Sequence, residues 1–140
     1  MNELVLPTHT NALGTIFGGA VLAWIDVAAA MAAQRHARRV VVTASMEAVD
    51  FKAPIRLGQV VTLLARVVHV KRTSMVVQVE VTAEDPLSGV RVDAVGAYVT
   101  FVALDESHRP VEVPALVLET EQDVRRSNEA AAMRRARRVR

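Results

Sequence analysis

The sequence contains no cysteine among its 140 residues. This absence excludes disulfide bonds, zinc sites built on thiolates and a cysteine nucleophile together. The chain is still long enough to bury a hydrophobic core, and its content of 51% hydrophobic and 23% charged residues is typical of a globular protein. We therefore expect one folded domain over residues 1 to 118, followed by a polar segment over residues 119 to 140.

The chain also lacks a hydrophobic run long enough to span a membrane. Its most apolar stretch, residues 20 to 33, is about 14 residues long and contains Asp26, whereas a transmembrane helix needs roughly 20 apolar residues. Residues 1 to 19 contain Glu3 but no lysine or arginine, unlike the positively charged start of a secretory signal peptide. We expect a buried helix here, and a cytoplasmic protein.

A basic surface of the kind that binds nucleic acid is missing from the body of the chain. Residues 119 to 140 hold seven arginines and four acidic residues, a net charge of +3, while the whole chain carries +2. Residues 1 to 118 therefore carry a net charge of −1. This distribution argues against a nucleic-acid partner, because the positive charge is confined to one end.

The pattern of apolar residues predicts one helix and several strands. The helix extends from the Gly18-Gly19 pair to about Arg35 and is apolar around nearly its whole circumference, so other elements should enclose it. Segments dense in valine, threonine and leucine predict four strands, at residues 40–51, 59–70, 75–84 and 90–103. Short connections at 71–74 and 85–89 favour an antiparallel meander of the last three strands, and residues 1–6 are typical of an edge strand. No internal repeat is visible.

These elements predict an α+β fold in which a twisted antiparallel sheet curls around the helix, with a polar helix or arginine-rich tail at the end.

Asp26 is the feature with the clearest chemical meaning. A carboxylate within an apolar helix is costly to bury unless it is satisfied or used. Gly18 and Gly19 stand at the start of the same helix, where unpaired backbone N–H groups favour negative charge and a missing side chain permits close approach. The combination indicates an enzyme site in which N–H groups stabilise an oxyanion. With no cysteine and no plausible serine–histidine pair, Asp26 would activate water or attack directly, and the amide of Asn11 would hold the water or the carbonyl oxygen.

The spacing of these residues predicts that one chain does not complete the site. Asp26 lies eight residues beyond Gly18, or roughly 12 Å along the helix axis. An attacking group and an oxyanion donor must both lie about 3 Å from the reacting atoms. We therefore expect Asp26 of one subunit to face Asn11 and Gly19 of another, in a dimer at least.

Residues 4 to 126 resemble the acyl-CoA thioester hydrolases of the hot dog superfamily. The matching residues are Pro7, Asn11, Gly14, Gly18, Gly19, Asp26, the run 42–45, Asp50, Phe51, Pro54, Ile55, Gly58, the run 72–75, Pro114, Leu116, Val117, Glu119 and Thr120. The resemblance implies a hot dog fold, hydrolysis of acyl-CoA to a free acid and CoA, and Asn11 and Asp26 as the catalytic pair. It also implies subunits that share active sites, often as trimers of dimers, and no cofactor besides the CoA of the substrate.

The CoA part of such a substrate needs cations and hydroxyls for its phosphates. Arg72, Thr73 and Ser74 supply both at a strand connection, and the resembling family places its ligand near this segment. We expect Lys71 and Arg56 to extend the same positive rim. A plain hairpin would have the same composition.

Several simpler or rival interpretations remain open at this point. Asp26 would also fit a satisfied structural carboxylate, and Gly18-Gly19 a tight turn. A hot dog dehydratase or hydratase would use His9 with Asp26, although a polar loop residue is the favoured interpretation of His9. A non-catalytic acyl-CoA sensor is the rival from another class.

The remaining histidines, His36, His69 and His108, show no metal-ligand spacing, and we expect no metal site. Trp24 and Met31 are expected in the core.

Overall fold

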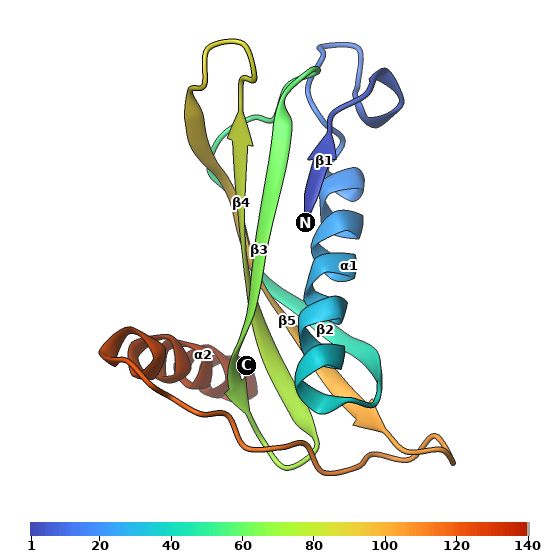
Figure 1. Cartoon of the computed structure of the whole chain (residues 1–140), viewed down its shortest axis with the longest axis vertical. Helices are drawn as coiled ribbons and strands as arrows, with labels where there is room; N and C mark the ends of the chain where they lie inside the picture. The colour runs from blue at the N-terminus through green and yellow to red at the C-terminus, as the bar shows by residue number, and fades with distance from the viewer. Residues whose placement is uncertain (140) are drawn as a thin grey trace.

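The computed structural model describes the backbone of residues 1–139 and the side chains of residues 1–135 (Figure 1). Its elements, in chain order, are β1 (Asn2–Leu4), a 3-10 turn η1 (Pro7–His9), α1 (Gly18–Ala37), β2 (Val40–Phe51), β3 (Val60–Val70), β4 (Ser74–Glu84), β5 (Arg91–Leu104) and α2 (Glu121–Val139). The strands begin and end within one residue of the four segments expected from their valine-rich pattern, and the α+β fold is confirmed.

The five strands form one antiparallel sheet with the order β1-β3-β4-β5-β2. Strands β3, β4 and β5 follow one another as the predicted meander, with Thr62 opposite Thr82 and Val77 opposite Val99. Strand β2 crosses to the far side and pairs with β5, while the short β1 pairs with β3. Strand β2 is therefore an edge strand 12 residues long.

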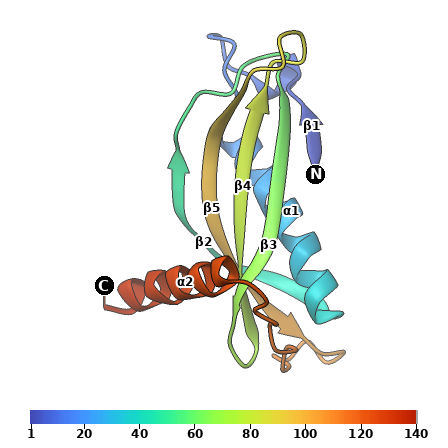
Figure 2. The same ribbon diagram turned by 60° about the vertical axis from the view of Figure 1, so that its left-hand side comes forward.

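Helix α1 lies along the concave face of the curled sheet (Figures 1 and 2). Its sheet-facing side is buried and includes the small residues Ala28, Ala29 and Ala33, which let a helix approach a sheet closely. The opposite side is not covered, since Val27 and Met31 are 52% and 42% exposed. The expectations that the helix is enclosed on nearly all sides and that Met31 is core are therefore wrong for a single chain, because the sheet covers only one side of it.

Helix α2 crosses the outer face of the same sheet, opposite α1 (Figure 2). Ala130 is fully buried in a small cluster with Val68 and Val76. At the start of the helix, the Thr120 hydroxyl accepts the N–H of Asp123, whose carboxylate accepts the N–H groups of Glu119 and Thr120. The hydrogen bond from Glu119 is the main reason why the pKa of Asp123 lies below its usual value. The described part of the polar segment is thus a helix, Glu121–Val139, that begins at a cap.

Among the described residues, no helix combines the length and hydrophobicity needed to cross a membrane.

Candidate active site

The loop that carries Asn11 is closed by hydrogen bonds to its own residues. The Asn11 side-chain oxygen accepts the N–H groups of Leu13 (2.9 Å) and Thr15 (3.3 Å), and its amide nitrogen donates to the Thr15 hydroxyl at 2.9 Å. The backbone turns back at Gly14, whose φ of 76° favours glycine. Because every contact is local, the position of Asn11 is fixed before any ligand binds.

The N–H groups at the start of α1 are available to a ligand. Phe17 precedes the helix and provides no side-chain cap, and the N–H groups of Ala20 and Val21 both point to the Phe17 carbonyl. Those of Gly18 and Gly19 have no partner in the described part of the chain. A Cβ atom at Gly19 would meet nothing within 4 Å, and one at Gly18 would lie 3.8 Å from the Phe51 ring. Packing within the chain does not require glycine at either position, whereas close approach of a ligand would.

Asp26 is held by a residue that the sequence analysis did not assign to the site. The hydroxyl of Thr43, on β2, donates to the Asp26 carboxylate at 2.8 Å. Asp26 is half-buried and Thr43 is exposed, so the carboxylate lies beside the uncovered side of α1 and not inside the core. The signal for Thr43 was present in the matching run 42–45, but only the strand register brings it to Asp26.

Within one chain the two halves of the site are separate. Gly18, Gly19 and Asp26 belong to one unbroken helix, on which a rise of about 1.5 Å per residue places the backbone of Asp26 roughly 10–12 Å beyond the two glycines. One protomer therefore does not bring Asp26 to the N–H groups at the start of its own helix.

His9 contacts the backbone of its own loop and the ring of Trp24. Its ring nitrogen Nδ1 accepts the N–H of Leu6 at 3.0 Å. The ring packs edge-to-face against Trp24, with centroids 5.0 Å apart. These contacts orient the imidazole and occupy one of its two nitrogens.

The residues expected to bind CoA do not lie together in one chain. Arg56 is next to the Asn11 loop, where it pairs with Thr15, and Lys71 to Thr73 form the turn at the other end of β3 (Figure 1). The expected single rim is therefore wrong within a protomer, because 11 residues of extended strand separate its parts. Ser74 is only 8% exposed and its hydroxyl accepts a hydrogen bond from Arg134 at 3.2 Å.

The other histidines are dispersed. His36 bonds the Pro114 carbonyl at 2.8 Å, and His69 bonds the Ser127 hydroxyl of α2 at 3.2 Å. Burial, with smaller effects from Arg134, Lys71 and Arg135, lowers the pKa of His69. No three histidine, aspartate or glutamate side chains group as a metal site in the part of the chain that the structure describes.

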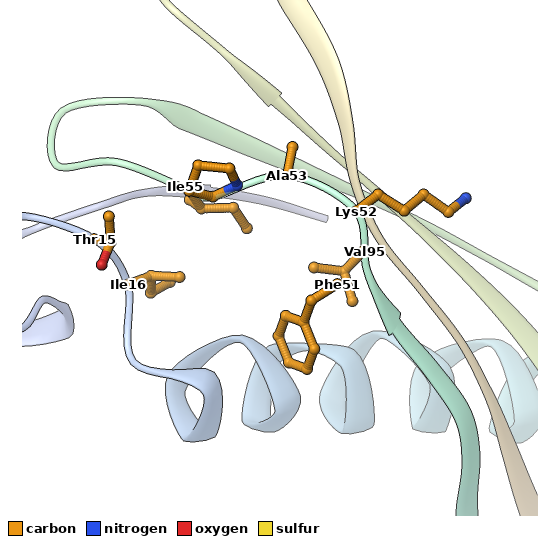
Figure 3. Close-up of a pocket in the computed structure, with 8 residues that line it drawn as sticks. Thr15, Ile16, Phe51, Lys52, Ala53, Ile55 and Val95 are labelled. Carbon is orange, nitrogen blue, oxygen red and sulfur yellow. The ribbon is translucent and has the colours of Figure 1, made fainter.

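A cleft of about 250 Å³ opens beside the first turn of α1 (Figure 3). Thr15 and Ile16 come to it from the Asn11 loop, Val95 from β5, and the other lining residues from the segment 51–55. The two segments are joined by a hydrogen bond from the Ile16 N–H to the Ile55 carbonyl at 2.8 Å. The cleft is therefore continuous with the loop that holds Asn11 and leads into Gly18.

Comparison with known proteins gives one consistent family. Residues 13–90 match the thioesterase superfamily. The chain is 44% identical over 126 residues to the acyl-CoA thioester hydrolase YkhA of Bacillus subtilis, covering 90% of this chain and 73% of that protein. It is 36% identical over 130 residues to the human cytosolic acyl coenzyme A thioester hydrolase, of which it covers 34%.

Solved structures agree in fold. A crystal structure of an apo hexameric acyl-CoA thioesterase superposes with a TM-score of 0.94 at 44% identity, covering 99% of this chain and 88% of the other. The acyl-CoA hydrolase of Staphylococcus aureus, solved with butyryl coenzyme A and coenzyme A, gives 0.91 at 37% identity, covering 99% of this chain and 87% of the other. The chain therefore belongs to the thioesterase superfamily with the hot dog fold, among its acyl-CoA thioester hydrolases.

Proposed function

We propose that the protein hydrolyses acyl-CoA thioesters to a free acid and CoA at a site formed by two subunits. Asp26 and Thr43 come from one subunit, and Asn11, Gly18 and Gly19 from its partner. The observation that carries the proposal is the separation of Asp26 from Gly18 and Gly19 along α1, combined with the exposure of the two glycines and the half-buried position of Asp26. The half with Asp26 lacks N–H groups for an oxyanion, and the half with Gly18 and Gly19 lacks a carboxylate.

In this site Asp26 accepts a proton from water as the water oxygen attacks the thioester carbonyl carbon. The carbonyl electrons move to oxygen, and the N–H groups of Gly18 and Gly19 of the partner subunit donate to that oxyanion. Collapse of the intermediate breaks the carbon–sulfur bond, and the CoA thiolate takes the proton from Asp26. Asn11 positions water or the carbonyl oxygen through an amide already fixed by Thr15. The Thr43 hydroxyl bonds one Asp26 oxygen at 2.8 Å, which holds the carboxylate in one orientation.

Variants of a relative support the choice of residues. The Staphylococcus aureus hydrolase has been crystallised with an asparagine, an aspartate or a threonine replaced by alanine. In that enzyme the aspartate and threonine lie 17 positions apart, as do Asp26 and Thr43 here. Its asparagine precedes the aspartate by 15 positions, as Asn11 precedes Asp26. We infer that the three correspond.

The exposed side of α1 and the position of β2 at the edge of the sheet support assembly with a second copy. An apolar helix side next to a long edge strand is a surface that proteins rarely leave in water. Two neighbours in fold are hexameric thioesterases. We infer a trimer of dimers that acts in the cytoplasm, as the cytosolic relatives do, with water as the co-substrate and no cofactor.

For CoA, we propose contacts with Arg72 and Thr73, with Lys71 at the same turn and Arg56 beside the Asn11 loop. Arg56 precedes β3 and the other three residues follow it, at the opposite end of the strand. Only neighbouring subunits would therefore bring all four residues to one ligand. Ser74 would act indirectly, since its hydroxyl holds Arg134.

The test is release of free thiol from acyl-CoAs of two to sixteen carbons. Because the protein has no cysteine, a thiol reagent detects only CoA. We expect stoichiometric CoA and acid. No thiol with any chain length would overturn the proposal. A changed carbon chain with the thioester intact would indicate a hydratase that uses His9, and binding without turnover would indicate a sensor.

Replacing Thr43 tests the orientation of Asp26. Thr43→Val keeps the shape and removes the hydroxyl, and we expect kcat to fall about tenfold, the scale of one lost hydrogen bond to a charged group. Thr43→Ser retains the donor and should keep most of the activity. Steady-state kinetics with one acyl-CoA compare the two variants, and equal losses in both would contradict a role for the hydroxyl.

A further inference from the structure

Positively charged side chains from two elements gather around His69, where α2 crosses the outer face of the sheet near the β3–β4 turn (Figure 2). Arg134 and Arg135 come from α2, and Lys71 comes from the turn. Burial has the largest effect in lowering the pKa of His69, and the charges of these three cations lower it further. A cation acts on an imidazole in this way mainly at short range. The three side chains therefore lie around one half-buried ring.

Two hydrogen bonds join α2 to the strands beside this cluster. Arg134 donates to the Ser74 hydroxyl, and the Nδ1 of His69 is bonded to the Ser127 hydroxyl, each at 3.2 Å. Ser74 is only 8% exposed, so the Arg134 guanidinium is held against the sheet and not extended into solvent. A side chain that is already oriented loses less conformational entropy when a ligand binds. Arg134 is therefore a pre-organised cation.

Two carboxylates of α2 act on other groups. Burial, and then the charge of Glu129, raises the pKa of Tyr98, and Asp123 pairs with Arg126 at 3.6 Å. Within the described residues, no carboxylate is among the groups that change the pKa of His69. The cluster thus favours an anion. A phosphate monoester fits it, because phosphate oxygens accept the paired N–H donors of arginine and are attracted by the charge of lysine.

We propose that Arg134, Arg135 and Lys71 form a binding site for a phosphate monoester. CoA carries such a group on its ribose, and a free nucleotide carries one at its 5′ end, so both sources have the required chemistry. With CoA as the source, the inference rests on the proposed function and adds α2 to the turn expected to bind CoA. A bound phosphate would favour the charged form of His69 and raise its pKa, so this ring reports occupancy of the site.

Histidine NMR tests the site without turnover. The chain has four histidines, and His69→Gln identifies the signal of His69. We expect CoA to raise the pKa of His69, and dephospho-CoA, which lacks the ribose monoester, to leave it unchanged. A response to 5′-AMP with none to CoA would identify a free nucleotide as the source. An equal response to dephospho-CoA, or no response to CoA, 5′-AMP or inorganic phosphate, would overturn the proposal.

Two substitutions on α2 test the cations by titration calorimetry. Arg134→Met should raise the Kd of CoA about tenfold, the scale of one lost hydrogen bond between charged groups, and should not change the Kd of dephospho-CoA. Arg135→Met should raise the Kd of CoA about threefold, as expected of a more exposed cation, and it keeps the hydrogen bond to Ser74. With a free nucleotide as the source, the same changes apply to the Kd of 5′-AMP.

Arg125→Met is the matched control. Arg125 is an exposed arginine of the same helix and is not among the charges that lower the pKa of His69, so its variant should bind as the wild type does. Circular dichroism checks that each variant keeps its helix content. A wild type that releases thiol, with unchanged Kd values in both folded cluster variants, would leave the proposed function standing and remove this site. If no acyl-CoA is hydrolysed, the proposed function fails, and the NMR titration still decides whether phosphate binds here.

Discussion

Replacing Asp26 by alanine is expected to lower turnover by about 10² or more, because the proposed reaction loses the group that takes a proton from water. KM and the melting temperature should change little, since Asp26 is half-buried and its partner Thr43 is exposed enough to be hydrated. The measurement is kcat by thiol release, alongside thermal unfolding followed by circular dichroism.

Asp93→Ala provides the matched control. Asp93 is an exposed carboxylate on β5, so its removal makes the same change in charge away from the helix. Its turnover should match the wild type. An Asp26 variant with unchanged turnover, or one that lost activity only by unfolding, would leave Asp26 as a structural residue.

Mixing two inactive variants is expected to restore activity. In a shared site, subunits with Asp26→Ala and subunits with Asn11→Ala form hybrid dimers in which one site has both defects and the other has none. Random pairing through a two-fold interface would recover about a quarter of the wild-type sites. Co-expression with two different affinity tags, followed by sequential purification, would isolate the hybrids for assay.

The two variants purified separately are the baseline for this measurement. Their activities should add to almost nothing, so recovery to about a quarter in the random mixture, or about a half in isolated hybrid dimers, stands far above it. Hybrids that carry both tags yet remain as inactive as their parents would show that each site is built within a single chain.

The strands were predictable from sequence because their signal is local. Alternating valines place β3 and β4 within one residue of their observed ends, and side-chain periodicity depends only on neighbouring residues. The glycine pair and Asp26 were also visible, since their helix is a continuous pattern. The features that sequence could not supply depend on tertiary arrangement.

Two wrong expectations and one missed contact show this limit. The sequence pattern of a helix that is apolar on all sides is the same whether its own sheet or a second copy of the chain covers it. The exposure of Val27 and Met31 was therefore not predictable. The Thr43 to Asp26 hydrogen bond depends on how β2 lies against α1. Arg56 and Arg72 are 16 positions apart in sequence, but the 11-residue strand β3 lies between them, so they stand near its opposite ends.

The unbroken course of α1 from Gly18 to Ala37 has a mechanical consequence. In the proposed dimer each helix contributes its first turn to one active site and its third turn, which carries Asp26, to the other. A tilt or shift of α1 would move residues of both active sites at once, so ligand binding at one site would affect the other.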